Sequence, residues 1–451
     1  MKNKRLCLAI IFCSVCFSLD YVPDQIIVKY KSSGLPVESH AVGASSNRSI
    51  TEQILKDIPF KIKTEREMFP KKALANVASM MGTEENPMDH IYHLILEPSS
   101  DVASAVDYLR QQPQIEYAEP NYVAHALDVI PNDPYYAASP NLKSIYDVYE
   151  MEKAWGITTG SSSVVVAVID TGVDHTHSDL LGKVILGYDY VNQDSTPTDD
   201  HGHGTHVAGT IAAICNNGVG ISGIGWNTRI YALKVLDSNG AGNFLTVGQA
   251  IYAAATYNAR VINLSLGGPY SSYIQSAVDY AFDKYCLVVV AAGNDGVDFS
   301  ATADWQSPVC NDGGKNEVLG VASVSTNQKL SSFSNYSSRF VDVCAVGEKV
   351  FSTLPESQYG SLSGTSMAAP MVSGVAALLL ARNSQLFASE NRDLIMAGAN
   401  SIDSVNPSYN GMLGSGLLDA FQSLLLLSPT PTSSVDTMTI QQFYSYPNPA
   451  A

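Results

Sequence analysis

Short apolar runs separated by helical stretches constrain the fold of this chain more than any other feature of its sequence. The runs Val164–Ile169, Val261–Leu264 and Leu287–Ala292 are too continuous for strands that keep one face in water. They alternate with stretches of helical pattern such as Val207–Ile214 and Val247–Tyr257. Strands buried on both faces and separated by helices form a mainly parallel sheet between helical layers. We therefore predict an α/β fold, a three-layer sandwich whose chemistry gathers at the carboxyl ends of its strands.

Composition places the chain among ordinary globular proteins and excludes some classes of function. Of its 451 residues, 45% are hydrophobic and 15% are charged, which suffices for a full-sized core and two or three domains. The formal net charge of -17 leaves no basic stripe to neutralise phosphates, so we expect no nucleic-acid partner. After residue 18 no apolar run reaches the roughly 20 residues that a membrane-spanning helix needs. We therefore expect no membrane span in the mature chain.

The first eighteen residues have the pattern of a signal peptide. Lys2, Lys4 and Arg5 precede an apolar run over residues 6–17, and Ser18 is a small residue suited to cleavage. We predict a signal peptide over residues 1–18 and a secreted, extracellular protein. Attachment to the cell surface stays open.

Cysteine usage gives no metal site. Three of the seven cysteines leave with the predicted signal peptide, and the four that remain are Cys215, Cys286, Cys310 and Cys344. Their spacing lacks the close pairs of a zinc site, and it allows three disulfide connectivities or none. Cys286 and Cys344 lie in apolar strand-like runs, which favours buried free thiols at both positions.

Residues 19–127 form a compact unit with its own pattern. The predicted strands are Asp24–Tyr30, Ile91–Leu96 and Ile115–Tyr122, and the predicted helices are Thr51–Ile58 and Val102–Leu109. This pattern indicates a small α+β domain of ferredoxin-like type. Residues 128–149 are rich in Pro, Asn, Asp and Tyr, and we predict a linker and loop there.

One serine lies where a glycine turn runs into a long apolar segment. The segment Met371–Leu380 is apolar on every side, so we predict a helix that crosses the middle of a large domain. Pro370 fits the first turn of such a helix, which places the helix start near Thr365 or Ser366. Ser366 then sits at a helix N-terminus, where free N–H groups suit a serine that attacks a carbonyl and leaves an oxyanion. The alternative is a serine that only caps the helix.

Three further polar residues end predicted elements of the α/β region. Asp170 ends the first buried strand, His203 lies where a loop enters a helix, and Asn294 follows a third strand. Taken singly, they are equally explained as a capping Asp, a hydrogen-bonded His and a turn Asn. Together they lie at the edge of the sheet where chemistry is expected.

The segments around these residues resemble the subtilisin-like serine proteases (subtilases, peptidase family S8). Those segments are Val168–Asp174, Asp199–Thr210, Ala291–Gly296 and Gly364–Pro370. They occur in the family's order, which runs Asp, His, Ser along the chain. The resemblance covers residues 135–427. The α/β-hydrolases fit less well, because their nucleophile lies in Gly-x-Ser-x-Gly and Ser366 is followed by Met367 and Ala368.

The resemblance implies a role for each of the four residues. Ser366 would be the nucleophile, His203 the general base and then acid, and Asp170 the carboxylate that orients His203. Asn294 would donate its amide to the oxyanion, with the backbone N–H of Ser366 as second donor. No organic cofactor is needed for this chemistry.

Substrate binding is expected along one strand. Ser265, Leu266, Gly267 and Gly268 resemble the family's substrate-binding strand, to which an extended peptide adds by backbone hydrogen bonds. The small residues Ala291, Ala292 and Gly293 suggest a roomy pocket for the residue before the cut.

Two metal interpretations stand beside this one. His201, His203 and His206 with Asp199 and Asp200 could form a metal cluster, but no His-Glu-x-x-His motif is present and the family uses only His203. We expect His206 to be structural, and His201 with the two aspartates to lie on a loop beside the cleft.

Calcium is implied more strongly by the resemblance. Asp179 follows Asp170 by nine residues, as does a calcium-binding aspartate in subtilases, and residues 214–221 resemble the loop that supplies the other oxygens. The implied ligands for a structural Ca²⁺ are Asp179, Ile214, Asn216, Asn217, Val219 and Ile221. The alternative is a hydrogen-bonded Gly-Asn loop without metal.

Residues 19–127 resemble subtilase propeptides, which implies a folding aid and temporary inhibitor whose extended end lies in the cleft. Cleavage would fall within residues 123–133. We expect the catalytic domain to cover residues 128–427, with a Pro/Ser/Thr linker after it. Residues 444–450 resemble the opening of C-terminal modules of secreted bacterial proteins, so residues 428–451 would be this linker and the start of a truncated module.

The sequence thus predicts a secreted, monomeric, self-processing serine endopeptidase that acts on proteins or peptides. Its own propeptide would be its intramolecular inhibitor. Two alternatives remain: a catalytically silent scaffold or binding protein with this fold, and an esterase that uses the same residues.

Overall fold

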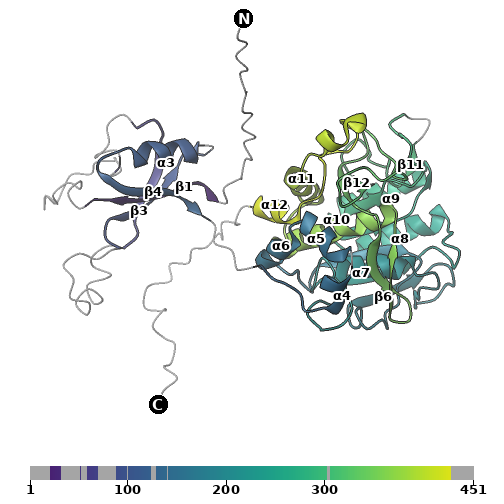
Figure 1. Ribbon diagram of the computed structural model, residues 1–451. Helices are drawn as coiled ribbons and strands as arrows, with labels where there is room; N and C mark the ends of the chain where they lie inside the picture. The colour runs from purple at the N-terminus through teal and green to yellow at the C-terminus, as the bar shows by residue number, and fades with distance from the viewer. Residues whose placement is uncertain are drawn as a thin grey trace, which may run out of the picture. The chain divides into compact units, whose positions relative to one another are not determined.

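The computed structural model describes residues 21–31, 51, 58–69, 88–98, 100–122, 128–139, 141–301 and 305–427. The chain divides into two compact units, residues 1–125 and residues 126–451, which we describe separately (Figure 1). The predicted signal peptide, most of the predicted helix Thr51–Ile58 and the predicted C-terminal linker lie outside the described residues.

The N-terminal unit is a four-stranded antiparallel sheet with one described long helix. Its strands are β1 (Tyr21–Tyr30), β2 (Ile62–Glu67), β3 (Ile91–Leu96) and β4 (Ile115–Tyr122), in the order β2-β3-β1-β4. Helix α3 (Val102–Arg110) buries Val102, Ala105, Val106 and Leu109, the positions that the sequence pattern indicated. The predicted α+β class is confirmed. Strand β2 escaped prediction because its sequence, IKTERE, carries almost no apolar alternation.

The larger unit is built on a seven-stranded parallel sheet in the order β13-β12-β10-β8-β5-β7-β6. The strands are β5 (Val165–Asp170), β6 (Val184–Asp189), β7 (Arg229–Lys234), β8 (Val261–Leu264), β10 (Leu287–Ala291), β12 (Val318–Val324) and β13 (Val343–Val346). Every residue of β5, β8, β10, β12 and β13 is buried, as their apolar runs predict.

Helices cover the sheet in two side-by-side pairs (Figure 1). Helix α7 (His203–Ala212) packs against α10 (Thr365–Arg382), and α8 (Phe244–Thr256) packs against α9 (Ser272–Asp283). Helices α11 (Ala388–Gly398) and α12 (Ala420–Leu425) pack against each other and against α10. The predicted α/β class with a parallel central sheet is confirmed.

Helix α10 crosses the centre of this unit. It contacts strands β5, β8, β10, β12 and β13, and its fifteen buried residues cover all sides. Among the described residues it is the one helix long and apolar enough to span a membrane, but 83% of it is buried within the protein, as in a core helix. The predicted start at Thr365 is confirmed, whereas Pro370 is the sixth helical residue and lies beyond the first turn.

The segment 128–149 is not the loop that its composition indicated. It forms helices α4 (Pro134–Ala138) and α5 (Leu142–Val148), followed by α6 (Met151–Ile157). Tyr136 and Tyr146 are almost fully buried and pack their rings against Trp155. The prediction was wrong because these tyrosines, which look polar in sequence, are apolar core residues here.

Small elements complete the unit. Two antiparallel pairs join β9 (Gly268–Pro269) to β11 (Gln306–Ser307) and β14 (Val350–Leu354) to β15 (Gln358–Leu362). Two 3₁₀ turns, η3 (Asp403–Val405) and η4 (Pro407–Tyr409), precede α12.

Candidate active site

A buried aspartate and a histidine meet at the carboxyl edge of the sheet. Asp170 is the last residue of β5 and is fully buried, and His203 is the first residue of α7. Asp170 Oδ1 lies 2.7 Å from His203 Nδ1 and also accepts a hydrogen bond of 2.7 Å from the Thr171 N–H. Because a carboxylate oxygen can only accept, His203 Nδ1 carries the proton and Nε2 is left as the basic atom.

The pKa of His203 reflects two opposing influences. Burial lowers this pKa, but the charge and hydrogen bond of Asp170 outweigh burial, so the pKa is raised above its ordinary value. The imidazolium is therefore stabilised at the place where a proton would be taken up.

Asp199 holds the start of α7 beside the end of β5. The N-cap residue Gly202 has no side chain to cap the helix, and Asp199 takes over this role. Its Oδ1 accepts from the N–H groups of His201 and Gly202 at 3.0 and 2.8 Å, and its Oδ2 accepts from the Thr205 N–H at 2.9 Å. The sequence placed Asp199 on a loop beside the cleft, whereas its side chain is buried under the helix.

Glycine at position 204 allows the close approach of these two elements. A Cβ atom there would lie 2.0 Å from the carbonyl oxygen of Gly172. Any larger residue would therefore push His203 away from Asp170.

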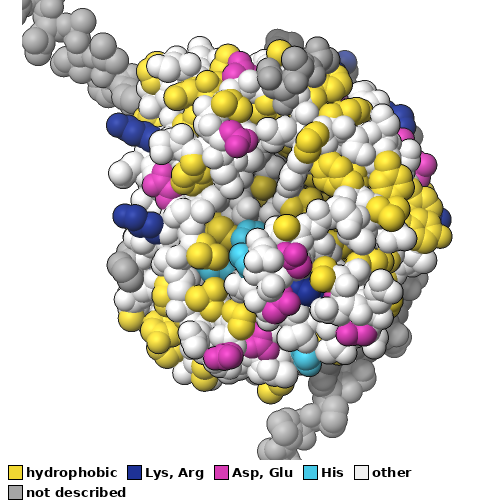
Figure 2. Space-filling model, turned by 90° about the vertical axis from the view of Figure 1, so that its right-hand side faces the viewer, with side chains coloured by type: hydrophobic (Ala, Val, Ile, Leu, Met, Phe, Trp, Pro, Cys, Tyr) yellow, Lys and Arg dark blue, Asp and Glu magenta, His cyan; other side chains and the backbone are white. Residues whose placement is uncertain are grey.

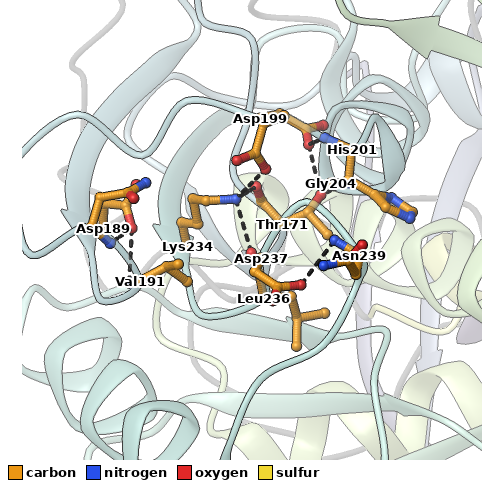
Figure 3. Close-up of polar contacts among 12 residues, drawn as sticks. Thr171, Asp189, Val191, Asp199, His201, Gly204, Lys234, Leu236, Asp237 and Asn239 are labelled. Atoms are coloured by element: carbon orange, nitrogen blue, oxygen red, sulfur yellow. Dashed lines mark hydrogen bonds and ion pairs between the residues drawn. The ribbon is translucent and has the colours of Figure 1, made fainter.

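A buried lysine ties together the loops around this pair (Figure 3). Lys234 ends β7, pairs in register with Asp170 and is fully buried. Its ammonium donates to the Thr171 carbonyl at 2.6 Å, to Asp200 Oδ1 at 2.6 Å and to the Leu236 carbonyl at 2.8 Å. Sequence analysis gave Lys234 no role, although a lysine within the apolar run 230–235 is an available signal, since buried lysines are rare.

Ser366 is the second residue of α10, and its carbonyl has an unusual partner. Pro370 has no N–H to donate to the Ser366 carbonyl, which would be its normal helical partner. That carbonyl instead accepts a hydrogen bond of 2.9 Å from Ser265 Oγ, while Ser366 Oγ donates to the Ser265 carbonyl at 3.3 Å. Pro370 thus leaves the helix start bonded to the segment after β8. Ser265–Gly267 of this segment is not a strand in the structure, and only Gly268 lies in a strand, β9.

In the described part of the chain, the hydrogen bond of Ser366 Oγ goes to Ser265 and not to His203. Catalytic hydrogen bonds are often long in ligand-free enzymes and close only when the substrate binds.

Asn294 is oriented by the first residue of α10. Its Oδ1 accepts from the Thr365 N–H at 2.9 Å and from Thr365 Oγ1 at 3.0 Å. Since the backbone N–H can only donate, these bonds fix the orientation of the amide, with Oδ1 as the acceptor at the start of α10 and Nδ2 as the donor atom.

Two adjoining hollows bring these groups together. His203 lines a hollow of about 670 Å³, and Ser366 and Asn294 line one of about 220 Å³. Ser265, Leu266 and Gly267 line both, and Gly268 lines the first. Figure 2 shows histidine side chains (cyan) in a hollow at the centre of this face.

The three small residues at and after the end of β10 do not all face the substrate cleft. Gly293 and Ala291 line the second hollow, whereas Ala292 is fully buried. Of the two alanines predicted for the pocket wall, Ala291 lines this pocket and Ala292 does not.

The histidines and aspartates of residues 199–206 are bonded to separate partners and do not converge. His206 Nε2 donates to the carbonyls of Val350 and Gly360, and burial lowers its pKa to about 4, so it is a neutral structural residue as expected. Asp200 pairs with Lys234. Within the described ranges no group of three or more His, Cys, Asp or Glu side chains could hold a metal ion.

The residues expected to bind calcium gather around a buried carboxylate. Asp179 is fully buried, and burial raises its pKa. Its Oδ1 accepts from Asn217 Nδ2 at 3.0 Å, and its Oδ2 accepts from the Ile221 N–H at 2.8 Å. The Ile214 N–H donates to the Asp179 carbonyl at 2.8 Å, and Val219 lies within the same loop.

A second aspartate, which sequence analysis missed, holds the same loop. Asp133 is buried and accepts from the N–H groups of Asn216 and Asn217 at 2.9 and 3.1 Å, and from Ser222 Oγ at 2.7 Å. Its position in the apparent linker 128–149 concealed it.

All four cysteines of the larger unit are free, which confirms the prediction for Cys286 and Cys344. Burial raises the pKa of the Cys286 thiol to about 12 and that of Cys310 to about 11, so both stay protonated.

Comparison with known proteins identifies the family. The model of the subtilase family matches residues 161–416, and the model of the fervidolysin N-terminal prodomain matches residues 17–121. The chain therefore belongs to the subtilase family of serine endopeptidases and carries a prodomain of the fervidolysin type.

Relatives of known name are close in sequence. Thermophilic serine proteinase from Bacillus sp. (strain AK1) is 45% identical over 281 residues, 62% of this chain and 66% of that protein. Thermitase from Thermoactinomyces vulgaris is 44% identical over 252 residues, 55% of this chain and 85% of that protein. A structure of proteases from Pseudoalteromonas arctica PAMC 21717 is similar with a TM-score of 0.57 and 31% identity, covering 66% of this chain and 99% of that one.

The lysine that links the loops gives a first prediction. Lys234→Met keeps the side-chain length but leaves Asp200 and two carbonyls without their donor, so we expect the free energy of unfolding to fall by about 3 kcal/mol. Chemical denaturation in a Ser366→Ala background measures this without self-digestion. In the otherwise wild-type chain, kcat on a short peptide should fall as Thr171 and Asp170 lose their support. Lys329→Met, at an exposed position, is the matched control, and equal behaviour of the two variants would contradict the role of Lys234.

Proposed function

We propose that Ser366, His203, Asp170 and Asn294 are the catalytic residues of this endopeptidase. The observation that carries the proposal is the 2.7 Å bond between His203 Nδ1 and buried Asp170. The segment Ser265–Gly267 lines both the His203 pocket and the Ser366 pocket, and Ser265 is bonded to Ser366.

Each residue has one chemical task. His203 Nε2 takes the proton of Ser366 Oγ as this oxygen attacks the scissile carbonyl, and Asp170 stabilises the imidazolium that forms. Collapse of the tetrahedral intermediate breaks the C–N bond, and His203 gives its proton to the leaving amine. Water then attacks the acyl-enzyme ester with His203 again as base, which releases the acid and restores Ser366.

Two donors are available for the oxyanion. The Ser366 backbone N–H belongs to the first turn of α10, where it has no helical acceptor. Asn294 Nδ2 is the second donor, because Thr365 occupies its Oδ1. Donors fixed in advance stabilise developing charge without reorganisation at the moment of reaction.

The substrate lies extended along Ser265–Gly268, and its backbone pairs with this segment. The residue before the cut enters the hollow beside Ala291 and Gly293, next to Ser366. Earlier residues of the substrate follow the segment from Ser265 towards Gly268 and Phe244. Backbone pairing gives affinity without strict dependence on side chains.

The prodomain would act as folding aid and intramolecular inhibitor of a monomeric zymogen that processes itself within residues 123–133. Export rests on residues 1–18, which have the pattern of a signal peptide. Family membership alone does not set the location, since a relative from Bacillus subtilis (strain 168), 39% identical over 246 residues, is named the major intracellular serine protease.

Self-processing gives the decisive test of the nucleophile. The purified wild-type chain should lose about a hundred N-terminal residues, the approximate size of one small domain, while Ser366→Ala stays whole, as read by intact mass. Ser361→Ala, at an exposed position of β15, is the control and should mature normally. If the wild type keeps its prodomain, the protein is a silent scaffold. If Ser366→Ala is cleaved as the wild type is, another protease matures this one. A protein substrate and a matched ester, offered to the mature chain, separate an endopeptidase from an esterase.

Calcium is the proposed structural cofactor of the loop 214–221. The oxygen types suit a hard cation: the buried Asp179 carboxylate, the amide oxygens of Asn216 and Asn217, and the carbonyl groups of Ile214, Val219 and Ile221. In this structure the side-chain oxygens accept hydrogen bonds instead, Asn216 Oδ1 from the Asn132 N–H, Asn217 Oδ1 from the Val219 N–H, and Asp179 from Asn217 Nδ2 and the Ile221 N–H. Calcium would have to replace these hydrogen bonds. A bound cation would offset the burial that raises the pKa of Asp179.

Removal of calcium should lower stability in a pH-dependent way. At a calcium concentration a hundred times Kd, binding adds about 2.7 kcal/mol to the free energy of unfolding. In the metal-free chain, stability should fall as pH rises through the raised pKa of Asp179, because the folded state disfavours the charged form. Thermal unfolding of Ser366→Ala with calcium or with EDTA measures both effects. Asp179→Asn should lose the calcium response and the exposed control Asp283→Asn should keep it; an unchanged Tm in EDTA would contradict the site.

A further inference from the structure

A large pocket of the catalytic unit lies outside the catalytic groups and is lined by tyrosine. Its volume is about 890 Å³, and six tyrosines line it: Tyr190, Tyr231, Tyr252, Tyr257, Tyr273 and Tyr280. Helices α8 and α9 supply most of the lining, and no charged side chain is among the described residues that form it. We call this feature the tyrosine groove.

Several rings of the tyrosine groove are exposed to solvent and are not core residues. Tyr252 and Tyr257 are 55% and 44% exposed. Tyr252 stacks on Tyr280 with ring centroids 4.7 Å apart, and Tyr257 stacks on Tyr231 at 4.2 Å. Stacking holds the rings in place while it leaves part of their surface open. Exposed, rigid aromatic surface of this kind is typical of interaction sites.

Some hydroxyl groups of the tyrosine groove are also available. Tyr190 donates to the Gln249 carbonyl at 3.3 Å and Tyr273 to the Leu245 carbonyl at 3.2 Å. The hydroxyls of Tyr231, Tyr252 and Tyr257 have no hydrogen-bond partner among the described residues. They can therefore donate to the carbonyls of a bound chain.

One helix, α8, lines both the substrate cleft and the tyrosine groove. Phe244 and Val247, in the first turn of α8, line the hollow that holds His203, and Gly248 begins the lining of the tyrosine groove. A Cβ on Gly248 would lie 2.4 Å from the Tyr273 ring, so glycine lets this ring close the gap between α8 and α9.

We propose that the tyrosine groove is an exosite that binds the polypeptide substrate upstream of the cleft, and that it favours uncharged stretches rich in proline and aromatic residues. This inference rests on the proposed function, because it uses the direction in which the substrate leaves Ser366 along Ser265–Gly268. Proline-rich chains dock in aromatic-lined grooves because they are already extended and their backbone carbonyls are free to accept hydrogen bonds.

The lengths of the two sites set the length of substrate required. The segment Ser265–Gly268 accommodates about four extended residues at roughly 3.3 Å each. From Gly248 to Thr256 helix α8 rises about 12 Å, at 1.5 Å per residue, which about four more extended residues would span. A peptide with four residues before the cut should fill the cleft alone, and one with eight should reach the tyrosine groove.

The test compares these two lengths in matched variants of the mature enzyme. Fluorogenic peptides carry the same four residues before the cut, with either nothing, Pro-Tyr-Pro-Tyr or Gly-Ser-Gly-Ser added at the N-terminal end. For the wild type, kcat/KM should be about tenfold higher with the Pro-Tyr extension than with the Gly-Ser extension, since two ring contacts are each worth about threefold or more. In Tyr252→Ala/Tyr257→Ala this advantage should vanish while the four-residue peptide is cut at the wild-type rate.

The control is Tyr285→Ala, which removes a tyrosine that is 54% exposed and stacks on Phe387 instead of lining the groove. It should behave as the wild type. An equal kcat/KM for both extensions in the wild type, or an unchanged Pro-Tyr advantage in the double variant, overturns the proposal.

A binding measurement separates failure of the exosite from failure of the proposed catalysis. Fluorescence anisotropy of a labelled Pro-Tyr-Pro-Tyr peptide needs no turnover: active enzyme is first blocked with a fluorophosphonate, and enzyme that this reagent does not label is used directly. If the wild type binds this peptide and Tyr252→Ala/Tyr257→Ala does not, the exosite is supported even when Ser366 proves not to be the nucleophile. The contradicting result has two parts: the wild type does not bind the peptide, and it is retained on an insoluble polysaccharide that does not retain the double variant. The groove would then be a carbohydrate site.

Discussion

The hydrogen bond between Asp170 and His203 is the contact around which the catalytic unit is arranged. A fully buried carboxylate is costly unless it is paired, and here its partner is an imidazole that must also face solvent and substrate. The edge of a parallel sheet meets both needs, because β5 ends in the interior while α7 begins at the surface. Three features bring the end of β5 and the start of α7 together. Asp199 accepts hydrogen bonds from the start of α7, Lys234 bonds the Thr171 carbonyl just after β5, and Gly204 has no side chain that would keep the two apart.

Helix α10 joins this pair to the nucleophile. Its burial on all sides fixes its position against the sheet, and its first turn carries Ser366 into the cleft. Pro370 adds a local constraint, because it frees the Ser366 carbonyl to accept from Ser265 Oγ. The segment that would pair with substrate and the residue that would attack it are thus bonded to each other, so substrate position and nucleophile position are coupled.

Sequence patterns predicted the features that depend on local chemistry. Continuous apolar runs predicted β5, β8 and β10. Pro370 predicted the start of α10 near Thr365, although this proline lies beyond the first turn. Elements whose stability comes from distant partners were missed. Strand β2 is charged and half exposed, and helices α4 and α5 depend on Tyr136 and Tyr146 packing against Trp155.

The same distinction holds within the site. Asp170, His203, Asn294 and Ser366 stand in recognisable motifs, whereas the partners that position them do not. Lys234 lies in an ordinary apolar strand, Asp133 lies in an apparent linker, and the buried role of Asp199 depends on the fold of its own loop. The tyrosine groove has no sequence signature either, because its six rings come from β7, α8, α9 and the residues that follow β6 and α8.

The central claim is that Asp170 holds His203 as the base for Ser366, and the pKa of His203 tests it most directly. Titration of the His203 Cε1–H signal by NMR, in Ser366→Ala with and without Asp170→Asn, gives this pKa for both environments. The account predicts a pKa above the ordinary 6.5 when Asp170 is present, because the carboxylate outweighs burial. It predicts a pKa below 6.5 with Asn at position 170, because burial is then opposed only by the smaller effect of the Asp199 charge. The same pKa in both chains would contradict it.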